Sequence, residues 1–341
     1  MKTYKNNTIS VSKGIGIILM VIGHCYLSGF VNHYIYCFHM PLFFFISGYC
    51  FNTKYFLDYK TFFFRKIKSL YLPFIKYNIL FIILHNILSS FYLVQDEYSF
   101  TELTKKIFLT IFLMEGTEQL LGGFWFLKQL LLASMGSYFI LKYIHRSIIQ
   151  IIILLLLIFL FDLYKLNIPY INCGSQTLLA TLFYIIGYKF QGINIKGDFF
   201  TIVLSSIIVF LIAIYSPTGI HGTTIYNVIP FIISSIAGII MTLNFSKFIL
   251  HKIRIAHLLE NLGNNTLIIL VYHFISFKII SLIAVLYYDL PIRLLTQFPI
   301  IQNLPDKQVW LILYCIIGLI FPLTLNKLYK LILIKINNHA A

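Results

Sequence analysis

Two histidines near the N-terminus are the residues best placed by their surroundings to do chemistry. His24 and His39 each lie in the middle of an apolar segment, and the two segments follow one another between Lys13 and Phe51. Apolar segments of this length span a bilayer, and an ionisable group inside one is costly enough to mark a functional site. Because imidazole titrates near neutrality, it can take the proton of a hydroxyl group. The pair therefore predicts a catalytic site within a membrane.

Lys13 precedes His24 by eleven residues, which is close to three helical turns. Both side chains would then project from nearly the same face of a helix, separated by about 16 Å along its axis. We expect Lys13 at the cytoplasmic surface and His24 near the middle of the membrane. The alternative is a structural pair, in which the lysine extends to the interface and the histidine bonds a neighbouring helix.

Pro41 follows His39 by two residues and interrupts the second segment. A proline at this position removes a backbone hydrogen bond and leaves the carbonyl of Cys37 without its helical partner. Such breaks are tolerated where protein or a cavity satisfies the backbone again. The sequence therefore predicts a polar pocket beside His39.

The connection 52–71 carries the densest group of cations on the same side of the membrane as Lys13, and it includes Arg65, Lys66 and Lys68. One interpretation is a solvated loop with no further role. The other is a site for a polyphosphate headgroup, which such a cluster would attract.

The longest connection on the opposite side, 95–123, contains an apolar stretch that is too short to span and predicts an interfacial helix. Glu115 and Glu118 follow this stretch, and Trp125 lies just beyond the connection. A loop of this kind predicts either a site for a polar substrate, such as a sugar, or a plain re-entrant connector.

Two more ionisable residues lie inside predicted spans. Lys128 lies a turn inside its segment, where it either extends to the outer interface or faces the same cavity as the histidines. His273 lies about two turns inside a later segment, where it either joins that cavity or makes a structural hydrogen bond.

The composition excludes a soluble globular protein. Of the 341 residues, 59% are hydrophobic and 11% are charged, and the mean hydropathy is +0.87. The apolar segments are continuous, whereas barrel strands would alternate, so they predict helices. We expect an all-α polytopic integral membrane protein, with one membrane domain over 1–341 and no soluble domain. About ten spans are predicted, at 15–30, 34–51, 72–94, 124–142, 147–163, 174–190, 199–216, 226–244, 265–288 and 308–330.

The net charge of +15 orients the chain in the membrane and does not indicate nucleic-acid binding. Most Lys and Arg residues fall in connections on one side of the predicted spans, and most acids fall on the other. This positive-inside pattern places both termini in the cytoplasm, with the cations against anionic lipid headgroups. The five cysteines contain no CxxC pair, so neither a disulfide framework nor a metal site is expected.

Three motifs resemble those of the membrane-bound acyltransferase family 3, in particular its fucose-4-O-acetylase-like O-acetyltransferase branch. The first is a basic residue and a histidine separated by ten residues, here Lys13 and His24. The second and most specific is FHMPLFFFISG, from Phe38 to Gly48. The third is the weaker LGNNTL pattern, which runs on to His273. The resemblance covers essentially the whole chain.

The resemblance implies transfer of an acyl group, usually acetyl from acetyl-CoA, to a hydroxyl of a cell-surface glycan or a polyprenyl-linked oligosaccharide. For such a reaction we expect His24 and His39 to be the catalytic groups, acting as base or as acyl carrier, with the CoA phosphates near Lys13, Arg65 and neighbouring lysines. The first two spans contain no Asp or Glu, so a backbone carbonyl, a hydroxyl such as Ser47 or an outer-loop acid would orient an imidazole. No metal is implied.

We expect the protein in the bacterial cytoplasmic (inner) membrane, and the sequence leaves a homo-oligomer open. Two departures from the family are visible. Lys13 stands where the family often has arginine, so its charge lacks the bidentate fork. Some members also carry an extracytoplasmic hydrolase-like domain, and without one we expect this chain to finish the reaction alone or with a partner.

The competing interpretation is a flippase or exporter of lipid-linked glycan without acyl-transfer chemistry. Such a protein would line its path with charges in both halves of the membrane. Here the ionisable residues within spans are few and centre on the first two segments. The sequence therefore favours the enzyme.

Overall fold

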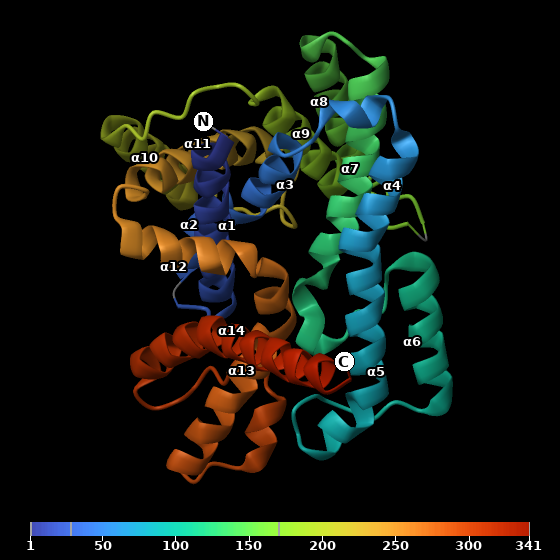
Figure 1. The fold of residues 1–341 in the computed structure, drawn as a ribbon, viewed down its shortest axis with the longest axis vertical. Coiled ribbons are helices and arrows are strands. Elements are labelled where there is room, and N and C mark those ends of the chain that lie inside the picture. The colour runs from blue at the N-terminus through green and yellow to red at the C-terminus, as the bar shows by residue number, and fades with distance from the viewer. Residues whose placement is uncertain (1, 28, 170, 341) are drawn as a thin grey trace.

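The computed structural model describes residues 2–27, 29–169 and 171–340, and it is built from helices (Figure 1). Helices make up 77% of it, and the described residues form no strand. The elements are α1 (Lys2–His24), α2 (Gly29–Tyr36), α3 (His39–Tyr49), η1 (Thr53–Phe56), α4 (Tyr59–Lys66), η2 (Ile67–Tyr71), α5 (Leu72–Ser90), α6 (Phe100–Leu113), η3 (Gln119–Phe124), α7 (Trp125–Tyr143), α8 (Ser147–Leu163), α9 (Ser175–Lys189), α10 (Phe199–Tyr215), α11 (Val228–Ile249), α12 (Ile253–Asn264), α13 (Thr266–Tyr287), η4 (Ile292–Thr296) and α14 (Lys307–Ala340).

Six helical stretches of the described chain are long and apolar enough to cross a membrane. They cover 7–24, 59–90, 119–143, 228–249, 266–287 and 307–332. The expectation of an all-α membrane protein is therefore confirmed, while the count of about ten spans and the orientation of the termini stay predictions. The predicted span at 34–51 takes a different form, because the chain divides there into α2 and α3.

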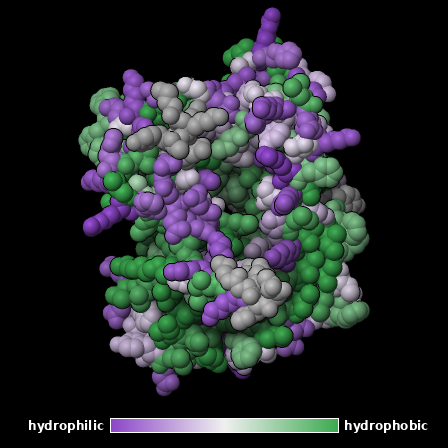
Figure 2. Space-filling model, viewed as in Figure 1, coloured by the Kyte–Doolittle hydropathy of each residue, from purple (hydrophilic) through white to green (hydrophobic). Residues whose placement is uncertain are grey.

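Apolar side chains on the outer surface match a lipid environment. Figure 2 shows hydrophobic residues over much of the lower half of one face, around α6 and α13, and hydrophilic residues gathered in the upper half. On α6, the predicted interfacial helix, Phe108 and Phe112 are 56% and 68% exposed. A surface of this kind is favourable where lipid covers it.

Helix α1 lies inside the bundle. It packs against α3, α11, α12, α13 and α14, and α3 packs in turn against α9. In Figure 1, α12 and α14 lie across the view, while α5 runs upright beside α6. The N-terminal helices that carry His24 and His39 are therefore enclosed by later parts of the chain.

Two glycines bring α3 and α9 into backbone contact. A Cβ atom on Gly48 of α3 would lie 1.8 Å from the carbonyl oxygen of Tyr184, and one on Gly187 of α9 would lie 2.0 Å from that of Phe45. Any larger residue at either position forces the helices apart, since small residues are what allow backbones to approach this closely. The crossing fixes the position of α3, whose first residue is His39.

The chain breaks between α2 and α3 at Cys37 and Phe38, as Pro41 predicts. The carbonyl oxygen of Cys37 accepts a 2.7 Å hydrogen bond from Oγ of Ser235 on α11. The backbone group that the proline leaves unpaired is therefore satisfied inside the protein. The side chain of Phe38 lies against Gly238 of α11, where a Cβ atom would come within 2.2 Å of it. Contacts with α11 thus hold both residues of the break.

Candidate functional site

A cavity of about 600 Å³ lies between α1, α3, η2, α7, the start of α13 and the connection between α10 and α11. This volume is typical of sites for small molecules and cofactors. We call one end of it the lysine end, formed by Lys13, Ser47, Cys50 and Thr266. We call the other the histidine end, formed by His24, Tyr36, His39, Trp125 and His221.

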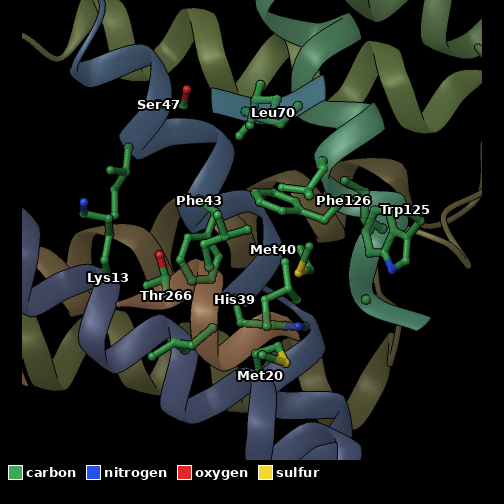
Figure 3. A pocket seen from close by; sticks show the side chains of 18 of the residues that line it. Lys13, Met20, His39, Met40, Phe43, Ser47, Leu70, Trp125, Phe126 and Thr266 are labelled. Atoms are coloured by element: carbon green, nitrogen blue, oxygen red, sulfur yellow. The ribbon is translucent and has the colours of Figure 1, made fainter. Parts of the chain in front are cut away.

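Figure 3 shows an apolar section between Lys13 and Trp125, with His39 below it in the view. Lys13 and Ser47 lie at one side of the view, Trp125 lies at the other, and Phe43 and Phe126 lie between them. The structure therefore brings into one cavity residues that the sequence placed on separate helices. Of the predicted site residues, Lys13, His24, His39, Ser47 and Trp125 line it.

The ring of His39 is oriented by a backbone carbonyl group of α2. Its Nδ1 lies 2.9 Å from the carbonyl oxygen of Ile35, so Nδ1 carries the proton and donates it to that carbonyl. The ring is 6% exposed and lines the cavity. Within the described chain no hydrogen bond reaches Nε2, which therefore offers a lone pair to a bound molecule. A backbone carbonyl fills the orienting role that the sequence left open.

His24 lies at the last residue of α1 and stacks on His273 of α13, with ring centroids 5.4 Å apart. Nδ1 of His273 lies 3.0 Å from the carbonyl oxygens of Ile269 and Leu270, and its buried Nε2 has no partner among the described residues. His273 is fully buried and does not line the cavity. The structure thus places it behind His24, in contact with that ring.

The lysine end gathers polar groups from three helices. Nζ of Lys66 on α4 lies 3.4 Å from Oγ of Ser47 on α3 and 5.4 Å from the centre of the Tyr184 ring. The following element, η2, is a π-helix, and Ser69 within it lines the cavity. Wider turns of this type are frequent at functional sites. Lys13 therefore lines this end, and Lys66 bonds Ser47, which also lines it.

The other predicted cations of the basic connection lie outside the cavity. Arg65 is exposed and donates a 2.7 Å hydrogen bond to the hydroxyl of Tyr55, and Lys68 is exposed. Asp58, the N-cap residue of α4, accepts hydrogen bonds from Thr61, and these lower the pKa of its carboxyl group. The predicted loop is thus wrong in form, because α4 and η2 cover residues 59–71 and belong to the helical stretch 59–90 that is long and apolar enough to cross a membrane. A role of Arg65 and Lys68 in binding a polyphosphate headgroup stays a prediction.

The predicted outer-loop residues also lie away from the cavity. Glu115 pairs with Lys128 at 3.0 Å, and Glu118 is 2% exposed between His85 at 2.7 Å and Lys106 at 3.1 Å. A buried carboxylate needs such partners, because its desolvation is costly. These pairs attach the outer loop to α5, α6 and α7, and they do not bring an acid to either histidine.

His221 is a lining residue that the sequence did not identify. It lies in the connection between α10 and α11, with its ring centroid 4.0 Å from that of Trp125 in an edge-to-face arrangement. Its Nδ1 is bonded to the amide of Gln176, and the residue is exposed. The available signal was a histidine close to Gly219 and Gly222 in an almost uncharged outer connection.

A family model described as an acyltransferase domain matches residues 6–327 of the chain. No curated protein and no solved structure gives a significant match. The match covers all the residues that line the cavity, from Lys13 to Leu270.

Proposed function

The chain belongs to the acyltransferase 3 family, whose activity is acyl transfer, and we propose that it moves an acetyl group from acetyl-CoA to a hydroxyl of a cell-surface glycan or lipid-linked sugar. We assign it to the fucose-4-O-acetylase-like branch and to the bacterial cytoplasmic membrane. We further propose about ten spans, with both termini in the cytoplasm, which agrees with the distribution of cations in the sequence.

The observation that carries this proposal is the cavity that joins Lys13 to the two histidines. The phosphates of acetyl-CoA would lie near Lys13, with Lys66 at the margin of the same end. The pantetheine arm would pass the apolar middle section beside Phe43 and Phe126. His24 follows Lys13 by eleven positions on α1, a rise of about 16 Å, which suits an extended arm.

At the histidine end, Nε2 of His39 would remove the proton of the acceptor hydroxyl as its oxygen attacks the thioester carbonyl. A bond forms between that oxygen and the carbonyl carbon, the carbon–sulfur bond breaks, and the CoA thiolate leaves with the electron pair. The imidazolium of His39 then returns the proton to the thiolate. The Nδ1 bond to Ile35 supports this role, because it fixes the tautomer with a basic Nε2.

His24 would donate a hydrogen bond to the carbonyl oxygen as negative charge develops on it. The ring of His273 stacks against that of His24 and would limit its rotation. The roles proposed for His24 and His39 follow from their positions in the cavity wall, and neither needs a metal ion.

The test is transfer of label from radioactive acetyl-CoA to host glycan by purified protein in lipid nanodiscs. We expect His39→Ala and His24→Ala each to lower the rate about 10²- to 10⁴-fold, the range typical of general acid–base groups. His251→Ala, which removes an exposed histidine, is the matched control. Wild-type rates in both cavity variants would show that the chemistry lies elsewhere.

A further inference from the structure

Two cysteines that lie far apart in the sequence meet beside the end of α1. Cys25 follows the last residue of α1, and Cys315 lies in α14. The thiol of Cys315 donates a hydrogen bond to Sγ of Cys25, and the two sulfur atoms are 3.4 Å apart. A disulfide joins its sulfur atoms at about 2.05 Å, so an approach of about 1.4 Å would bring this pair to bonding distance. Both cysteines are free thiols in the structure.

Contacts on both helices hold the two sulfur atoms in place. The thiol of Cys25 donates to the carbonyl oxygen of Val21 at 3.3 Å, which leaves the lone pairs of its sulfur free to accept. On α14, the hydroxyl of Tyr314 lies 2.8 Å from Oγ of Ser281 on α13. One turn further along α14, a Cβ atom on Gly318 would lie 2.9 Å from Cγ1 of Val21. The helices α1 and α14 are therefore closely packed at this point.

The pair lies next to His24 but outside the cavity. Cys25 is the residue after His24, and neither cysteine is a lining residue. The ring of His24 stacks on that of His273, which in turn lies 5.7 Å from the ring of Phe277. The ring of Phe277 lies 5.6 Å from that of Tyr314 on α14. A new bond between the cysteines would therefore act on His24 from behind, without entering the cavity.

Cys315 is the thiol that a reagent in the bilayer reaches first. It is half-buried, whereas Cys25 is 0% exposed. Ile312 and Ile316 beside it are 58% and 44% exposed, on a helix that is long and apolar enough to span a membrane. An oxidant that arrives through lipid must be small and uncharged, because the transfer of a charge into hydrocarbon is costly. Hydrogen peroxide meets both conditions.

We propose that Cys25 and Cys315 are a redox-sensitive pair, which hydrogen peroxide converts into a reversible disulfide between α1 and α14. In the first step the sulfur of Cys315 attacks one peroxide oxygen, the oxygen–oxygen bond breaks, and the thiol proton leaves with the other oxygen as water. The sulfur of Cys25 then attacks the sulfenic acid on Cys315. A sulfur–sulfur bond forms, the sulfur–oxygen bond breaks, and the proton of Cys25 leaves with the hydroxide as a second water. Each sulfur gives up one electron, and the peroxide takes up both.

The disulfide should lower the rate of acyl transfer. A displacement of about 1 Å at a reacting group typically lowers a rate about 10²-fold. Rotation of the two cysteine side chains takes up part of the approach of about 1.4 Å, so we expect about a tenfold loss. The disulfide itself is independent of the proposed function, whereas its effect on the rate rests on the role proposed for His24.

A peptide map tests the disulfide without any assay of activity. Protein in nanodiscs is treated with hydrogen peroxide, its remaining thiols are alkylated under denaturing conditions, and the digest is analysed by mass spectrometry. We expect a linked peptide that contains Cys25 and Cys315, which dithiothreitol separates. Cys173→Ser, which removes another half-buried cysteine, is the matched control and should still give this peptide.

The effect on the rate is measured by label transfer before and after peroxide. Wild type should lose about tenfold, and dithiothreitol should restore it. Cys315→Ser should keep its rate, or Cys315→Ala if the serine variant fails to fold. Met20 and Met40 line the cavity in all these proteins, so a loss through methionine oxidation would affect the variants equally and would resist dithiothreitol.

Absence of the linked peptide from peroxide-treated wild type overturns the inference. A linked peptide in protein whose rate is unchanged, or an equal loss of rate in Cys315→Ser, overturns the effect on His24. These outcomes are distinct from failure of the proposed function. Protein that transfers no acetyl group before peroxide is added refutes the enzymatic activity, while the peptide map still decides whether the disulfide forms.

Discussion

Replacing Gly48 with alanine should damage the site from a distance, through the crossing of α3 and α9. The new Cβ atom would start 1.8 Å from the carbonyl oxygen of Tyr184, whereas real Cβ atoms essentially never come closer than 3.0 Å. The helices must therefore separate by about 1.2 Å, the difference between these distances, and the obstacle is backbone that cannot rotate away. His39 is on the same helix, nine residues earlier, and moves with it.

A displacement of about 1 Å at a reacting group typically lowers the rate about 10²-fold. Forcing an extra methyl group into a packed interface also costs about 1–3 kcal/mol of unfolding free energy. We therefore expect Gly48→Ala to lower acetyl transfer about 100-fold, with a lower unfolding temperature in nanodiscs. Both are measured on the same preparation, by label transfer and by thermal unfolding.

Gly136→Ala is the matched control, because Gly136 faces the same helix α9 from α7. Its Cβ position lies 3.7 Å from Oγ1 of Thr181, an ordinary contact. This variant should keep both rate and stability close to those of wild type. If Gly48→Ala loses no more activity than Gly136→Ala, the position of α3 does not control His39 and the reasoning fails.

Three further changes separate binding of the donor from stability of the fold. Lys13→Met should raise the KM for acetyl-CoA about tenfold, as expected for the loss of one charge-assisted hydrogen bond, and should leave the KM for the acceptor unchanged. An unchanged KM for acetyl-CoA would show that Lys13 does not bind the donor. Ser235→Ala leaves the carbonyl of Cys37 unpaired and should lower the unfolding free energy by about 1–3 kcal/mol in a denaturant titration; full stability would mean that water or another group replaces the bond. Glu118→Gln should lower thermal stability without changing either KM, because Glu118 lies outside the cavity, and a changed acetyl-CoA KM would contradict that placement.

The sequence predicts the parts of the site that depend on local geometry. Helix periodicity places Lys13 and His24 on one face of α1, and both line the cavity. The effect of Pro41 on the carbonyl of Cys37 follows from the chemistry of proline, although only the structure identifies Ser235 as the new partner. Distances along a single helix are fixed by its rise, so such predictions need no knowledge of the fold.

Contacts between distant segments are beyond this reasoning. Trp125 and His221 lie 96 positions apart in the sequence, and no helical or strand periodicity relates them. The same holds for Glu118, whose position within the predicted outer connection 95–123 suggests substrate binding but whose partner is the buried His85. A carboxylate in a sequence does not show which cation it will meet. Pairing depends on the tertiary arrangement of α5, α6 and α7.

Helix α1 runs without interruption from Lys2 to His24, so its two functional positions are a constant length apart. Under the proposed function this fixed separation selects the donor by its length. Only a donor whose anionic group and reactive carbonyl are about 16 Å apart can contact Lys13 and His24 at once. Acetyl phosphate, in which these groups are adjacent, would reach one position and miss the other. The enzyme would then select its donor by the distance between these two groups, without contacts to the atoms that connect them.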